Sequence, residues 1–141
     1  MKIKFIIFTL FCTFWLNNKA NAQICNYCSI EELQSTLKEN DIDYSINYNV
    51  KSKTVFTHKE EYFIKEWHVE YNMCYLYRII VLDQSKVKSL KSLINKHFNP
   101  ISENNWESLD NIVNLELKEG YYNFSFYPKA NYHNLNLNNN Y

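Results

Sequence analysis

The sequence predicts an α+β domain: a single antiparallel sheet of five to six strands with two helices packed on one face, in the order α-β-β-β-β-α-β-β. Two segments carry apolar residues at helical spacing, and the other segments alternate apolar and polar residues between short turns. The chain has 141 residues, of which 46% are hydrophobic, enough for one core and too many for a disordered protein. We expect one domain over residues 23–127, without an internal repeat.

Residues 1–22 have the three parts of a signal peptide. Lys2 and Lys4 give a basic start, residues 5–16 form an almost unbroken apolar run of 12, and Ala20-Asn21-Ala22 is a small-residue cleavage motif. An apolar run of 12 is shorter than the roughly 20 residues that a helix needs to cross a bilayer. We predict cleavage after Ala22 and a secreted or periplasmic protein with no membrane attachment.

The charge balance argues against polyanionic partners. Removing the leader with its three lysines leaves 12 basic against 15 acidic residues, a net charge of −3. A mildly acidic domain does not attract nucleic acid or anionic lipid, and we expect neither as a partner. The chain's single glycine, Gly120, leaves no glycine-rich loop for a nucleotide phosphate, and we predict no cofactor.

The first half of the domain predicts a helix followed by a four-strand meander. Ser29 and Glu32 form a capping box, so the helix is expected over about residues 30–39. Strands are expected at residues 42–50, 54–57, 61–71 and 73–82.

The third of these strands has the clearest two-faced pattern. Its apolar residues are expected to face the core: Phe63, Trp67, Val69 and Tyr71. Its opposite face carries Glu66, His68 and Glu70 toward solvent. Arg78 is the exception in the next strand, which is otherwise apolar on both faces. It could pair with Glu66 or Glu70 across the hairpin, or bind an anionic ligand.

The second half predicts a helix and a hairpin. Asp83 or Ser85 caps the helix, whose apolar stripe extends to Phe98 before Pro100 ends it. Residues 101–110 are expected to form a loop carrying Trp106. A hairpin follows over residues 113–126, turning at Glu119-Gly120, and residues 128–141 form a disordered Asn-rich tail.

Three cysteines remain after the predicted cleavage: Cys25, Cys28 and Cys74. An exported protein meets an oxidising compartment, so a disulfide is expected, and three thiols leave one over. A bridge from Cys28 or Cys25 to Cys74 is the favoured pairing. A Cys28–Cys74 bridge would close a loop of about 45 residues, worth roughly 4 kcal/mol. A Cys25–Cys28 ring is the competing pairing.

The Cys25-Asn26-Tyr27-Cys28 segment resembles the redox motif of thioredoxin-like proteins. The resemblance implies a thiol-disulfide oxidoreductase using Cys25 and Cys28, with the thiol at the helix start made reactive by a lowered pKa. The sequence departs from that family because no strand precedes the motif. Neither Pro100 nor Pro128 stands where the family's cis-proline faces the cysteines. The histidines are scattered without ligand spacing, and we predict no metal site.

No catalytic set is evident, so the leading interpretation is a non-enzymatic binding or interaction domain for a protein, peptide or glycan. Aromatic and arginine side chains are typical of binding surfaces, and the candidates here are Tyr75, Tyr77, Arg78 and Trp106. The oxidoreductase is one alternative. A secreted inhibitor or immunity-type protein, with its acidic surface opposing a basic partner, is the other.

Overall fold

The computed structural model describes residues 28–49 and 53–129. In chain order its elements are α3 (Ile30–Glu39), β1 (Ser45–Asn49), β2 (Lys53–Lys59), β3 (Phe63–Glu70), β4 (Met73–Val81), the 3₁₀ turn η1 (Gln84–Lys86), α4 (Val87–His97), β5 (Asn99–Ser102), β6 (Asn105–Glu107), β7 (Asn111–Lys118) and β8 (Tyr121–Pro128). The predicted leader and Cys25 lie outside the described residues, and so does the predicted tail beyond Lys129. Within these ranges neither helix has the length and apolar character needed to span a membrane.

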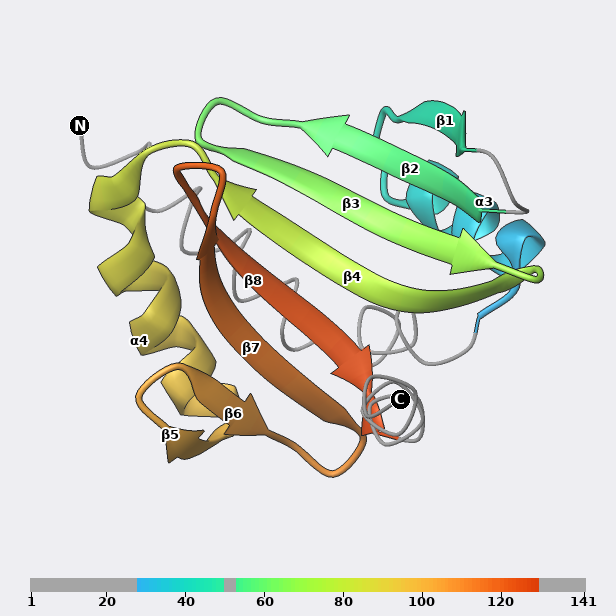
Figure 1. The fold of residues 1–141 in the computed structure, drawn as a ribbon. Coiled ribbons are helices and arrows are strands. Elements are labelled where there is room, and N and C mark those ends of the chain that lie inside the picture. Colours follow the sequence, from blue (N-terminus) through green and yellow to red (C-terminus); the bar gives the residue numbers. More distant parts are fainter. Residues whose placement is uncertain (1–27, 50–52, 130–141) are drawn as a thin grey trace, which may run out of the picture.

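The predicted fold class, a sheet of five to six strands with two helices packed on one face, is wrong. The strands form one eight-stranded antiparallel sheet in the order β1-β2-β3-β4-β8-β7-β6-β5, so the described chain is mostly strand with two short helices (Figure 1). Of the two unforeseen strands, β6 lies within the segment predicted as a loop, and β5 begins two residues before that segment. All four residues of β5 are exposed, so no apolar alternation marks it. Pro100 is tolerated there because β5 is an edge strand, where a missing N–H breaks no ladder.

The structure contains a repeat that the sequence does not reveal. A helix followed by four strands occurs twice, first as α3 with β1–β4 and then as α4 with β5–β8. The last strand of each unit, β4 or β8, lies at the centre of the sheet, and the first strand lies at an edge. The two units therefore meet along the antiparallel β4–β8 pair, where Ile79 lies opposite Phe124.

The predicted boundaries of the first helix are confirmed, and its N-terminal cap is visible in local hydrogen bonds. At the start of α3, the Glu32 N–H donates to Ser29 Oγ over 3.2 Å, and the Ser29 N–H donates to Glu32 Oε2 over 2.8 Å. This reciprocal pair satisfies two backbone donors that a helix N-terminus leaves open. The predicted cap of the second helix, Asp83, instead caps η1 by accepting from the Ser85 N–H, and α4 continues directly from that turn.

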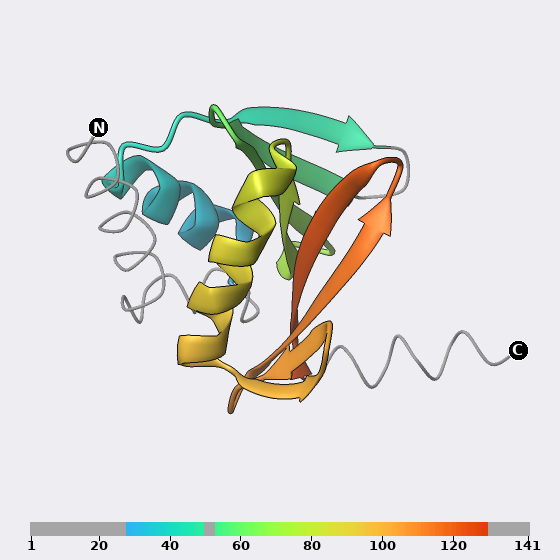
Figure 2. The same cartoon turned by 90° about the vertical axis from the view of Figure 1, so that its left-hand side faces the viewer.

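One apolar core joins the helices to the sheet. Leu33 and Leu37 of α3 and Leu90 and Ile94 of α4 are buried with a shared set of strand residues. The strand residues at its centre are Phe56, Trp67, Val69, Val81, Val113 and Phe124. Figure 2 shows α3 and α4 to the left of β3 and β4, and no described helix lies on the other side of these strands. That other side is called the helix-free face below.

The β3–β4 hairpin turn corrects one face assignment. Tyr71, which the alternation predicts to be in the core, is 81% exposed at the turn. Tyr71 and Asn72 have φ values of 50° and 63°, the backbone of a type I′ turn. The predicted glycine turn has the same geometry, with φ values of 54° at Glu119 and 84° at Gly120. A tyrosine in the left-handed region is strained, because its side chain crowds the backbone there.

Replacing Tyr71 with asparagine is expected to stabilise the protein by about 0.5–1 kcal/mol, because asparagine tolerates a positive φ. The side chain that is lost is 81% exposed, so little buried area is lost with it. Urea denaturation of the variant and the parent measures the change. As a control, Asn72→Tyr places a second tyrosine at a positive φ and removes the acceptor of the Ile30 N–H, so it should destabilise.

Candidate functional site

The four predicted surface residues do not share a surface. Tyr77 is 4% exposed and Trp106 is 2% exposed, and both belong to the core. Tyr75 and Arg78 are half-buried on the helix-free face. The separation has a structural cause. Trp67 pairs with Tyr77 and Val69 pairs with Cys74, so β4 holds one more residue than β3 across this stretch. The bulge places Tyr75 beside His68, with 6.3 Å between ring centroids.

Trp106 is fixed under α4 as a packing anchor. Its indole Nε1–H donates to Asn95 Oδ1 over 2.6 Å, and its ring lies 6.2 Å from that of Phe124. The Lys91 ammonium lies over the ring, 5.9 Å from the centroid. With its polar atom satisfied and its ring enclosed, Trp106 ties β6 to α4 and is not available to a ligand.

Three polar side chains converge at the middle of the helix-free face. Glu66 and His68 project from β3, and Arg78 projects from β4 directly opposite Glu66. Glu66 Oε2 lies 2.9 Å from His68 Nε2 and 3.6 Å from Arg78 Nη1. Their side chains are only 16–21% exposed. We call these residues the Glu66–His68–Arg78 cluster; it confirms that Arg78 pairs with Glu66 across the hairpin.

The cluster holds Glu66 as a carboxylate. The hydrogen bond from His68, together with the charges of His68 and Arg78, lowers the pKa of Glu66 although partial burial opposes the shift. The neighbouring Tyr75 is affected in the opposite sense: burial and the nearby Glu70 raise its pKa. Tyr75 therefore remains a neutral phenol that can donate a hydrogen bond from the helix-free face.

Two buried polar atoms at or beside the cluster have no hydrogen-bond partner among the described residues. Ser125 of β8 lies directly across from Arg78 and is 1% exposed. Among the described residues, Ser125 Oγ and Arg78 Nε are buried without a hydrogen-bond partner. Arg78 also reaches Glu66 only at 3.6 Å, longer than a normal hydrogen bond. The guanidinium thus has donors to offer to another acceptor.

Glu66→Gln is expected to remove part of the acid sensitivity of the fold. A lowered pKa in the folded state means that the carboxylate stabilises the protein above its ordinary value of 4.5 and loses this contribution as the pH falls through the lower folded value. The stability difference between the parent and the variant should therefore shrink below about pH 4.5. Chemical denaturation at several pH values measures it. Glu103→Gln, at an exposed turn residue, is the control and should follow the parent.

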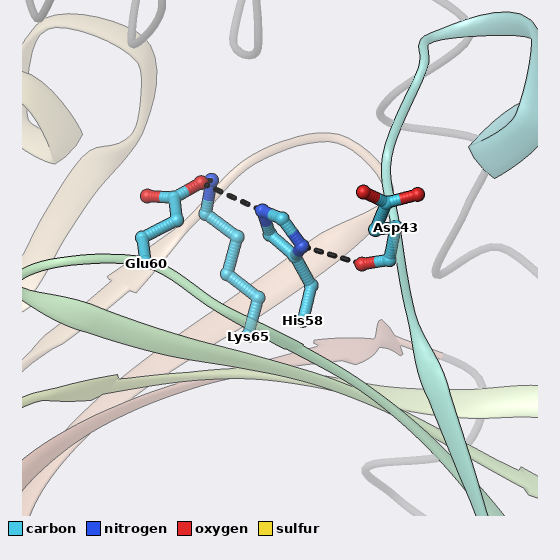
Figure 3. A network of polar contacts seen from close by, with 4 residues as sticks. All are labelled: Asp43, His58, Glu60 and Lys65. Atoms are coloured by element: carbon cyan, nitrogen blue, oxygen red, sulfur yellow. Dashed lines mark hydrogen bonds and ion pairs between the residues drawn. The ribbon is translucent and has the colours of Figure 1, made fainter.

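A second polar network lies on the core side of β2 and β3 (Figure 3). Lys65, 6% exposed, points to the same side as Phe63 and Trp67, and its ammonium forms an ion pair with Glu60. His58 Nδ1–H donates to the Asp43 carbonyl oxygen over 2.5 Å, and His58 Nε2 lies 3.4 Å from Glu60 Oε1. Figure 3 shows the four residues in a row that links the start of β1 to the β2–β3 turn.

Sequence reasoning missed Lys65. The available signal was its position: in a strand whose odd-numbered residues face the core, Lys65 falls between Phe63 and Trp67. A lysine at an inward position needs a partner, because a buried ammonium is costly unless it is paired. Glu60 supplies the partner from the adjacent turn. The network closes the end of the core between β1 and β3, and we interpret it as structural.

The structure brings two of the three predicted cysteines together. Cys28 and Cys74 are both buried, and the Cys74 N–H donates to the Cys28 carbonyl oxygen over 2.9 Å. The hydrogen bond between the two side chains and the burial of the site raise the pKa of the Cys28 thiol. A buried thiol with a raised pKa is a poor nucleophile, in contrast to the reactive thiol that the thioredoxin-like motif implies.

The residues that the structure describes contain no group of three or more His, Cys, Asp or Glu side chains arranged to hold a metal ion. A scan against protein-family models, a search of curated proteins and a search of solved structures each found no match to this chain.

Proposed function

We propose that this chain is an exported, non-enzymatic binding domain that uses its helix-free face to hold a peptide segment of a partner protein through a carboxylate. The observation that carries the proposal is the Glu66–His68–Arg78 cluster, in which the guanidinium of Arg78 is largely desolvated but only loosely paired. A desolvated guanidinium with open donors is suited to a carboxylate, which it can hold through two parallel hydrogen bonds.

The surroundings of Arg78 support a peptide as the ligand. Tyr75 and Tyr127 lie near each other and near Arg78 on the helix-free face, and both are half-buried. Tyrosine and arginine are among the residue types most enriched at the positions that dominate binding energy in protein interfaces. Tyrosine in addition buries a large area at a low entropic cost. The flanking His68 and Ser125 add further hydrogen-bonding groups. This face therefore combines one charged anchor with a rim of aromatic and polar contacts.

The test is a titration of the isotopically labelled protein with a short peptide that ends in a free carboxylate, and with the same peptide amidated. We expect the free carboxylate to shift the backbone amide signals of β3, β4 and β8 around Arg78. The amidated peptide should have an effect at least tenfold weaker, since it lacks the charge that the guanidinium recognises. Equal responses to both peptides, or shifts confined to other elements, would contradict the proposal.

Arg78→Gln is expected to weaken the carboxylate titration by at least tenfold, and Arg78→Lys should restore only part of it, because lysine keeps the charge without the two-pronged geometry. Lys88→Gln, which removes one positive charge from the exposed side of α4, is the matched control and should bind as the parent does. If Lys88→Gln weakens binding as much as Arg78→Gln, then binding depends on the net charge of the protein and not on specific contacts with Arg78.

A further inference from the structure

We infer that Cys28 and Cys74 form a disulfide that fastens the start of α3 to the central hairpin. The sequence leaves three pairings open among Cys25, Cys28 and Cys74, and the structure favours this one through the backbone. Ser29 pairs with Met73 in an isolated antiparallel bridge, and the Cys74 N–H donates to the Cys28 carbonyl oxygen over 2.9 Å. Cys28 and Cys74 are thereby opposite each other on two neighbouring antiparallel segments.

This backbone arrangement matches what a disulfide requires. Directly opposed residues in an antiparallel pair have Cα atoms about 4.5–5.5 Å apart. A disulfide needs a Cα separation of about 4.4–6.8 Å, so the bridge can form without moving the backbone. The side chains also face each other, because a hydrogen bond joins them. Both residues are buried in the same apolar cluster, where Cys74 is 0% exposed and Cys28 is 9% exposed.

The neighbouring contacts hold the two segments in register. The Ile30 N–H donates to Asn72 Oδ1 over 3.3 Å, so the turn between β3 and β4 also contacts the first residue of α3. Together with the Ser29–Met73 bridge, this contact fixes the approach of residues 28–30 to residues 72–74. The two cysteines are thus positioned by backbone pairing and by the Asn72 side chain, contacts that do not depend on the sulfur atoms.

The oxidation itself needs a disulfide-bearing oxidant, such as oxidised glutathione or a disulfide-donating oxidoreductase. One cysteine thiolate attacks the oxidant's disulfide and forms a mixed disulfide, and the second thiolate then displaces the oxidant's remaining thiolate. The two cysteines lose two protons and two electrons, and the oxidant gains the electrons and is released as thiols. Because burial and hydrogen bonding suppress the thiolate of Cys28 in the folded protein, this step belongs to folding, before the site closes.

The experiment maps disulfides in protein that has been refolded from the reduced, denatured state in a buffer of reduced and oxidised glutathione. Remaining thiols are alkylated under denaturing conditions, and the protein is digested without reduction and analysed by mass spectrometry. We expect one linked pair of peptides containing Cys28 and Cys74, while Cys25 is recovered alkylated. Refolding in glutathione separates this inference from the prediction of export, because it supplies the oxidant directly.

Three results would overturn the inference: a Cys25–Cys28 ring with Cys74 alkylated, a Cys25–Cys74 bridge, or alkylation of all three residues in refolded protein. A Cys25→Ser variant is the matched control, and it should give the same Cys28–Cys74 peptide in the same yield. If the chain does not refold, the same mapping is applied to protein recovered after export into an oxidising compartment, and the same outcomes decide.

Discussion

Reduction of the Cys28–Cys74 bridge is expected to lower the free energy of unfolding by about 4 kcal/mol, because the bridge closes a loop of about 45 residues in the unfolded chain. The loop contains α3 and β1–β3, so the bridge restricts nearly the whole first repeat unit in the denatured state. In a domain of this size, about 4 kcal/mol corresponds to a fall in Tm of at least roughly 15 °C. Native strain in the bridge would make the loss smaller.

The measurement compares urea denaturation of oxidised protein with that of protein kept in a strong reductant. A Cys28→Ala/Cys74→Ala double variant should resemble the reduced parent and should not respond to the reductant. Cys25→Ser should behave as the parent does in both conditions. If reductant leaves the parent's stability unchanged while the double variant loses several kcal/mol, then the two cysteines act as packing residues alone.

Local chemistry allowed much of the fold to be predicted from the sequence. The capping box at Ser29 and the turn at Gly120 are read from residue type, since few alternatives satisfy a helix N-terminus or a positive φ. The alternation in β3 likewise predicts which side Trp67 and Val69 face. Strands β5 and β6 could not be predicted this way. In β6, the buried Trp106 lies opposite Val113 of β7, and β5 adds to the sheet only by pairing with β6.

The candidate site was predictable only in part. A two-residue β3–β4 turn alone would place Tyr77 opposite Glu66, and the β-bulge shifts the register by one residue so that Arg78 lies there instead. The different fates of Tyr75 and Tyr77 depend on a β-bulge, for which the sequence carries no signal. The proximity of Cys28 to Cys74 depends on how a segment preceding α3 returns to the hairpin end. Such long-range pairings are set by tertiary packing, which residue periodicity does not encode.

Removing the carboxylate that pairs with Lys65 is the other change with a large expected effect. Glu60→Gln leaves an ammonium that is 6% exposed without its counter-ion, and we expect a loss of about 2–3 kcal/mol. This loss is smaller than the roughly 3–5 kcal/mol of a fully buried pair because the Glu60 side chain is 23% exposed and water can reach that end. As a control, Glu107→Gln breaks the more exposed pair with Lys129 and should cost at most about 0.5 kcal/mol.

A double-mutant cycle separates the ion pair from the packing of the lysine stem. Lys65→Met keeps most of the apolar stem and removes the charge, leaving a Glu60 carboxylate that still contacts His58 and solvent. The methionine variant should therefore lose less stability than Glu60→Gln. In the double variant no buried charge is left unpaired, so its loss should be smaller than that of Glu60→Gln alone. If the losses measured by urea denaturation are additive, Glu60 and Lys65 are not energetically coupled. The contribution of Lys65 to stability would then come from the packing of its apolar stem.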